Sequence, residues 1–137
     1  MQNSSKYLLT LISVLLIITA FFMPQSVLSR STSAEIPVEP RLIYPVTEEV
    51  NVSGPTLLFK WWHAAIKIDR FEFKLYKGGG SSGEVVVKKT LPFNVSSFEV
   101  ESSLLENNQT YTWCLRQVSD NGLKSEKSFI TFRVIKK

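Results

Sequence analysis

The sequence is poor in the residues that build covalent cross-links, metal centres and nucleophilic active sites. It contains one cysteine, Cys114, and one histidine, His63. A single cysteine excludes an intrachain disulfide framework and a cysteine-based zinc site, and a single histidine excludes a metal site built on two histidines. We therefore predict no metal and no cofactor, and we expect the fold to be stabilised by its hydrophobic core alone.

Helical periodicity and phosphate-binding motifs are missing as well. Beyond residue 55 the apolar segments alternate with a period of two, which is typical of strands. The glycine run at residues 78–83 lacks the Lys-Ser/Thr helix start of a P-loop, so we interpret it as a flexible loop. His63 follows two tryptophans at a strand end, and Cys114 is expected to face outward as a half-exposed thiol. We predict that the protein is not an enzyme.

Charge gives little support for nucleic acid as a partner. All 12 acidic residues follow Ala34, whereas Lys6 and Arg30, two of the 16 basic residues, precede it. The remaining lysines and arginines are scattered and do not form a basic stripe with interleaved aromatics, so we predict no nucleic acid partner. Within residues 35–137 three triplets, at Asn51, Asn94 and Asn108, fit the N-glycosylation pattern, but a chain rich in Ser and Thr matches it by chance.

The N-terminus carries an export signal. Residues 8–23 form an uncharged apolar run, with Lys6 before it and Pro24 after it, which is the pattern of a secretory signal peptide. The run is slightly shorter than the roughly 20 apolar residues that span a bilayer. We therefore expect residues 1–34 to be a signal peptide, cleaved before Arg30 or Glu35, or an uncleaved anchor. Residues 35–137 would be extracytoplasmic, that is secreted, periplasmic or tethered, with membrane contact only through residues 8–23.

Residues 35–137 are predicted to form a single β-sandwich. Residues 37–55 are interpreted as a linker that includes a short edge strand at 40–45, between two prolines. Further strands are predicted at 56–62, 70–77, 85–87, 98–101, 111–118 and 129–135. Seven short strands with turn signals between them predict an all-β fold of two antiparallel sheets. The predicted core consists of Phe59, Trp61, Phe71, Phe73, Tyr111, Trp113, Leu115, Ile130 and Phe132.

Three features of this region resemble a fibronectin type III domain, and in particular its bacterial cell-envelope forms. Trp61 closes the second strand, where that family has its core tryptophan, and Leu105 stands six residues before Tyr111, as in the family's tyrosine corner. The segment 111–125 resembles the sixth strand and the turn that follows it. The resemblance implies a seven-stranded sandwich in which the Tyr111 hydroxyl bonds to backbone. Gln117 departs from it, because a polar side chain at an inward position needs a hydrogen-bond partner or lies near the end of the barrel.

The sequence favours a binding or spacer module at the cell envelope. The sheet of the third, fourth, sixth and seventh strands should expose arginines interleaved with aromatics, which are residues that interfaces use as anchors. Trp62 should point outward beside the buried Trp61. The candidate partner face consists of Trp62, Arg70, Lys74, Tyr76, Arg116, Phe129 and Arg133. A protein partner is the first hypothesis. The alternative is a carbohydrate-binding accessory domain that uses Trp62 and Tyr76. The arginines and aromatics on the sheet of the third, fourth, sixth and seventh strands could also form a ladder of cross-strand pairs that stabilises the sheet without any partner.

Overall fold

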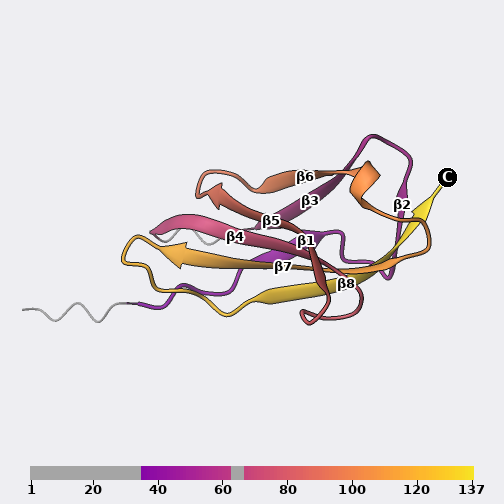
Figure 1. Ribbon diagram of the computed structural model, residues 1–137. Helices are drawn as coiled ribbons and strands as arrows, with labels where there is room; N and C mark the ends of the chain where they lie inside the picture. The colour runs from indigo at the N-terminus through magenta and orange to yellow at the C-terminus, as the bar shows by residue number, and fades with distance from the viewer. Residues whose placement is uncertain (1–34, 63–66) are drawn as a thin grey trace, which may run out of the picture. The chain divides into compact units, whose positions relative to one another are not determined.

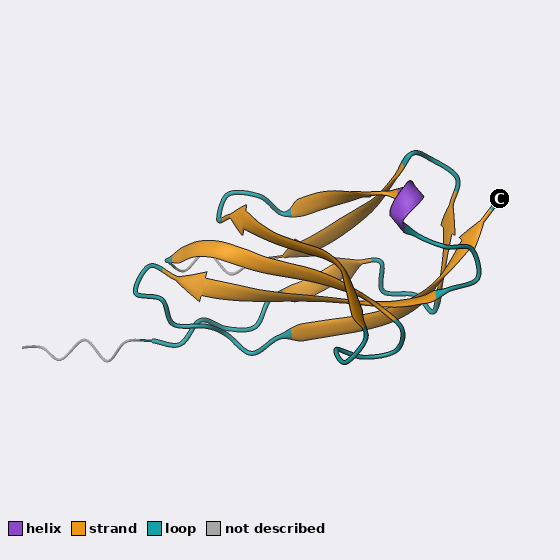
Figure 2. Ribbon diagram, viewed as in Figure 1, coloured by secondary structure: helices purple, strands orange, loops and turns teal. Residues whose placement is uncertain are grey.

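The computed structural model describes residues 35–62 and 67–137, which form eight strands and one short 3-10 turn. The strands are β1 (Arg41–Tyr44), β2 (Glu49–Val52), β3 (Thr56–Trp62), β4 (Ile68–Lys77), β5 (Glu84–Pro92), β6 (Ser97–Glu101), β7 (Thr110–Ser119) and β8 (Ser128–Lys136). Figure 2 shows that the turn after β6, Ser102–Leu104, is the one helical segment of this part of the chain. No helix in these two ranges is long and apolar enough to cross a membrane. Residues 1–34, predicted to be an export segment, and His63 lie outside the described residues.

The strands form two sheets that pack as a sandwich (Figure 1). One sheet has three strands in the order β1-β3-β6, and the other has five in the order β2-β8-β7-β4-β5. The predicted all-β sandwich is thus confirmed. The predicted strand at 56–62 has the bounds of β3, and the others differ from the observed strands mainly at their ends.

The segment between residues 37 and 55 differs from the prediction of a linker with one edge strand. It contains two strands, because the chain leaves the three-stranded sheet after β1 and joins the five-stranded sheet as β2. There β2 pairs with β8 in parallel, with Val50 opposite Val134. The prediction of seven strands and purely antiparallel sheets is therefore wrong on this point. Alternation was present in the sequence, since Val50 and Val52 are buried while Glu49 and Asn51 are exposed.

Aromatic side chains from both sheets meet in the core. Phe59 from the three-stranded sheet has its ring centroid 5.2 Å from Phe73 and 5.2 Å from Trp113, both in edge-on geometry. Trp61 packs edge-on against Phe71 at 5.5 Å. Edge-to-face contacts of this kind add to the free energy gained by burying the rings. Eight of the nine predicted core residues are buried, and Ile130 is half-buried against them.

The tyrosine corner expected from the resemblance is present. Tyr111 is fully buried on β7, and its hydroxyl accepts a hydrogen bond from the backbone N–H of Glu106 at 2.8 Å. Leu105, which is also buried, precedes that N–H. The corner therefore connects β7 to the turn that brings the chain across from β6 (Figure 1).

Three hydrogen bonds attach the segment before and after β1 to the sandwich. The Gln117 side-chain amide donates to the Val38 carbonyl, the Ser128 hydroxyl to the Pro40 carbonyl, and the Trp113 indole N–H to the Pro45 carbonyl at 3.0 Å. Gln117 is 1% exposed, and its side-chain N–H group has the partner that a buried donor requires, whereas its side-chain oxygen has no hydrogen-bond partner among the described residues. These contacts give residues 38–45 a defined path along the domain, which positions β1 and the surface around it.

Candidate functional site

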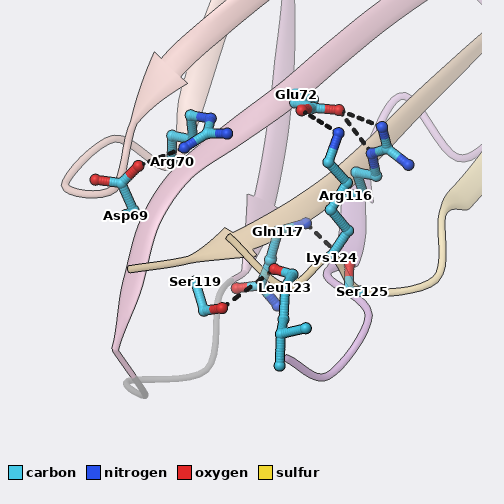
Figure 3. A network of polar contacts seen from close by, with 9 residues as sticks. All are labelled: Asp69, Arg70, Glu72, Arg116, Gln117, Ser119, Leu123, Lys124 and Ser125. Atoms are coloured by element: carbon cyan, nitrogen blue, oxygen red, sulfur yellow. Dashed lines mark hydrogen bonds and ion pairs between the residues drawn. The ribbon is translucent and has the colours of Figure 1, made fainter. Parts of the chain in front are cut away.

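The predicted partner face on the five-stranded sheet is largely occupied by internal ion pairs. The Glu72 carboxylate on β4 accepts a hydrogen bond from Arg116 Nε at 2.6 Å and another from Lys124 Nζ at 3.1 Å (Figure 3). Arg116 lies opposite Glu72 in the β4–β7 ladder. Burial raises the pKa of Glu72, but the hydrogen bonds and charges of Arg116 and Lys124 outweigh it and hold the pKa below its ordinary value.

The other two arginines of this face are also paired. Arg70 contacts Asp69 at 2.6 Å, and Arg133 contacts Glu49 on the neighbouring β2. A guanidinium already bound to a carboxylate has fewer donors to offer a partner, and cross-strand pairs of this kind stabilise sheets by themselves. Of the predicted face, Lys74 is half-exposed without an ion pair in the described residues, and Phe129 is exposed.

We expect Glu72→Gln to lower the free energy of unfolding at neutral pH by about 1 kcal/mol, since it removes one carboxylate shared by two cations. A lowered folded-state pKa contributes stability above the unfolded-state pKa, and this contribution is lost as the pH falls through the folded-state value. The gap between wild type and Glu72→Gln should therefore close below about pH 4.5. Urea unfolding from pH 7 to pH 3 measures it, with Glu126→Gln as the control. A difference in unfolding free energy that does not change with pH would contradict the role of the Glu72 carboxylate in binding Arg116 and Lys124.

The expectation that Tyr76 would be exposed is wrong. Tyr76 does lie on the outer face, opposite Thr112, but it is only 5% exposed. It stands on a central strand with β5 on one side and β7 on the other, so neighbours crowd its ring from both sides. Burial and the adjacent Cys114 thiol raise the pKa of Tyr76. Its ring is therefore not available for stacking on a ligand.

The expectation of a half-exposed thiol at Cys114 is wrong for the same reason. Cys114 faces outward opposite Lys74, next to Tyr76 in the ladder, and is 2% exposed. Burial raises the pKa of the thiol, although nearby lysines and Arg116 act in the opposite direction. A buried thiol with a raised pKa presents little thiolate, which is the reactive form.

Cys114 should accordingly react with Ellman's reagent at pH 8 on the order of 100-fold more slowly in the native protein than in denaturing guanidinium. We expect Tyr76→Ala, which removes the ring beside the thiol, to restore much of the rate in the folded state. A native rate equal to the denatured rate would show that the thiol is accessible.

Trp62 lies on the other sheet, apart from the rest of the predicted face. It ends β3 and is 59% exposed, while its neighbour Trp61 is 1% exposed. A groove of about 400 Å³ opens beside it and is lined by Arg41, Leu42, Ile43, Val46 and Trp62. We call this the Trp62 groove. Ile43 and Val46 are both 47% exposed, so the groove presents apolar surface to solvent.

Cations alternate with aromatics across the two strands beside the Trp62 groove. Arg41 on β1 lies directly opposite Trp62 on β3, and Tyr44 lies opposite Lys60. Because Lys60 and Trp62 are two residues apart on one strand, they share a face of the sheet. Neither Arg41 nor Lys60 forms an ion pair with any residue that the structure describes. The face therefore carries two free cations beside an exposed indole.

Sequence reasoning found Trp62 but not the side chains around it. Arg41, Tyr44 and Lys60 were not predicted as site residues, since their place beside Trp62 depends on the antiparallel register of β1 and β3. The available signal was the pair of exposed hydrophobics in the segment PRLIYPV, where Ile43 and Val46 stand among polar and proline residues. No group of three or more His, Cys, Asp or Glu side chains in 35–62 and 67–137 could hold a metal ion.

Comparison with solved structures identifies the fold. A structure of the fibronectin(III)-like modules of Clostridium thermocellum CbhA matches with a TM-score of 0.53 and 17% identity, covering 71% of this chain and 97% of that one. The Clostridium perfringens spore cortex lytic enzyme SleM matches with a TM-score of 0.52 and 14% identity, covering 71% of this chain and 28% of that one. The sequence matches no family model and no curated protein. The chain thus has a fibronectin type III-like fold, as its sequence predicted.

Proposed function

We propose that this chain is an exported, non-catalytic accessory module that binds a component of the cell envelope through the Trp62 groove. The observation that carries the proposal is the 59% exposure of Trp62 beside two exposed aliphatic side chains. The other two tryptophans, Trp61 and Trp113, are buried. A large exposed apolar side chain over a hollow in the surface is typical of a binding site.

The fold supports an accessory role. The solved structures that resemble this chain include modules of CbhA and part of the spore cortex lytic enzyme SleM. The matched part is 28% of the SleM chain. In SleM the matched part is therefore accompanied by a larger remainder of the chain. The apolar run at residues 8–23 supports export, so the natural setting of the groove would be the outside of the cytoplasmic membrane.

The distribution of charges favours the β1–β3 face over the opposite sheet as the binding surface. On the five-stranded sheet, Arg70, Arg116 and Arg133 are each bound to a carboxylate, which favours a structural role for them. On the β1–β3 face, Arg41 and Lys60 have no carboxylate partner among residues 35–62 and 67–137, which favours a role in binding. A protein partner at the five-stranded sheet, the first hypothesis from the sequence, therefore has weaker support than a ligand at the Trp62 groove.

Binding to isolated envelopes tests the proposal. The unit Ser33–Lys137, which contains all the core residues, would be mixed with washed envelopes of the producing organism and sedimented. We expect saturable binding that Trp62→Ala weakens at least about tenfold. The control is Phe93→Ala, which truncates an aromatic that is 57% exposed in the turn between β5 and β6. Equal binding by Trp62→Ala and wild type would overturn the proposal.

A further inference from the structure

We infer that the Trp62 groove binds an acidic polysaccharide, with a sugar ring stacked on the Trp62 indole and an acidic substituent paired with Arg41 and Lys60. This inference rests on the proposed function and names the class of ligand.

The aromatic part of the site suits a sugar ring. A pyranose has an apolar C–H face and a rim of hydroxyls, so it stacks on a flat indole while its polar rim remains in water. Trp62 provides that surface, since its ring forms no stack with the aromatic rings of the described residues and is 59% exposed. Ile43 and Val46 extend the apolar floor. The volume of about 400 Å³ lies within the range of small-ligand sites and fits one or two sugar units.

The charged part of the site suits an anion. Arg41 stands directly opposite Trp62 and Lys60 stands on the same strand and face, so both cations flank the indole. Arg70, Arg116 and Arg133, the other arginines in the described part of the chain, are each paired with a carboxylate of the protein itself. Arg41 and Lys60 have no such carboxylate within the described part of the chain. An acidic substituent on the ligand would supply it and would be bound by charge-assisted hydrogen bonds.

The surroundings disfavour a membrane and a large protein interface at this groove. On the same sheet, Leu58 pairs with Glu99 and Thr56 with Glu101, so both glutamates project from the face that carries Trp62. A flat anionic bilayer would bring its headgroups against them, whereas a narrow polymer crosses only the cationic end. Stable protein interfaces bury about 800 Å² on each side through roughly 20 residues. The groove offers five lining residues.

Affinity electrophoresis of the unit Ser33–Lys137 tests the inference with defined polymers. The probes are alginate and dextran sulfate as anionic chains, neutral dextran as the uncharged match to dextran sulfate, and vesicles of phosphatidylglycerol assayed by flotation. We expect retardation by at least one anionic polymer. Trp62→Ala and Arg41→Gln should each weaken it about tenfold, Phe93→Ala should leave it unchanged, and added salt should weaken it because the contacts are ionic.

Three results would overturn the inference. These are no Trp62-dependent retardation by either anionic polymer, equal retardation by neutral dextran, or binding to anionic vesicles that exceeds binding to the polymers. A parallel treatment of envelopes separates this failure from that of the proposed function. Periodate, which cleaves sugar diols, should abolish Trp62-dependent sedimentation, whereas protease should leave it. If protease abolished the Trp62-dependent sedimentation and periodate left it, the proposed binding function would stand, but the ligand would be a protein and not a polysaccharide.

Discussion

Replacing Phe59 with alanine should lower the free energy of unfolding by about 3–5 kcal/mol, the range found when a buried phenylalanine is truncated. Phe59 is 0% exposed and connects the two sheets, with edge-on contacts to Phe73, Trp113 and Phe132. Those partners lie on β4, β7 and β8, so the cavity would open at the centre of the sandwich. Domains of this size are stable by only about 5–15 kcal/mol, and the variant should be close to unfolding.

Urea unfolding followed by tryptophan fluorescence measures this loss. Phe129→Ala is the matched control, because it removes the same ring from a position that is 46% exposed on β8. We expect the control to change stability by less than about 0.5 kcal/mol. A loss of less than about 1 kcal/mol in Phe59→Ala would mean that the two sheets do not share the core described above.

Replacing Tyr111 with phenylalanine should cost about 1–3 kcal/mol, because it leaves the Glu106 N–H without its acceptor while keeping the buried ring. The substitution removes a single oxygen, so the loss reports on the tyrosine corner and not on packing. The same unfolding measurement applies. Tyr44→Phe is the control, since Tyr44 is 38% exposed and its hydroxyl has no hydrogen bond within the described residues.

A loss in Tyr111→Phe no larger than in Tyr44→Phe would show that the corner is dispensable. Recovery of the loss when Glu106 is also replaced by proline, which has no N–H to satisfy, would support the unpaired donor as the source of the cost.

Much of the fold could be predicted from the sequence, because side chains on a strand alternate strictly between its two faces. In β3, Leu57, Phe59 and Trp61 are buried, and in β4 the same holds for Phe71, Phe73 and Leu75. The resemblance to the fibronectin type III family, carried in part by Leu105 and Tyr111, implied a hydrogen bond between the Tyr111 hydroxyl and the backbone, and the structure has it. The need of Gln117 for a partner was also predicted, although the partner, Val38, lies 79 residues away in the sequence.

The candidate site could be predicted only in part. Trp62 was found because it stands next to Trp61 on a strand, so one of the two indoles had to face outward. Its separation from Arg70, Arg116 and the rest of the predicted face follows from sheet membership, which alternation does not encode. The burial of Tyr76 has the same origin, since it depends on the side chains that β5 and β7 place beside it, and alternation does not encode those neighbours.

By itself, the sequence determined that the chain has no disulfide, that its apolar side chains alternate along strands and that its aromatics form the core, because these follow from composition and from the two-residue repeat of a strand. Only the tertiary structure decided that β2 joins β8, that Cys114 is buried next to Tyr76, and that Arg41 stands beside Trp62. These depend on which strands are neighbours and in what register. Backbone hydrogen bonds do not depend on which side chains the strands carry, so neighbours are chosen by packing across the whole sandwich and not by any local segment.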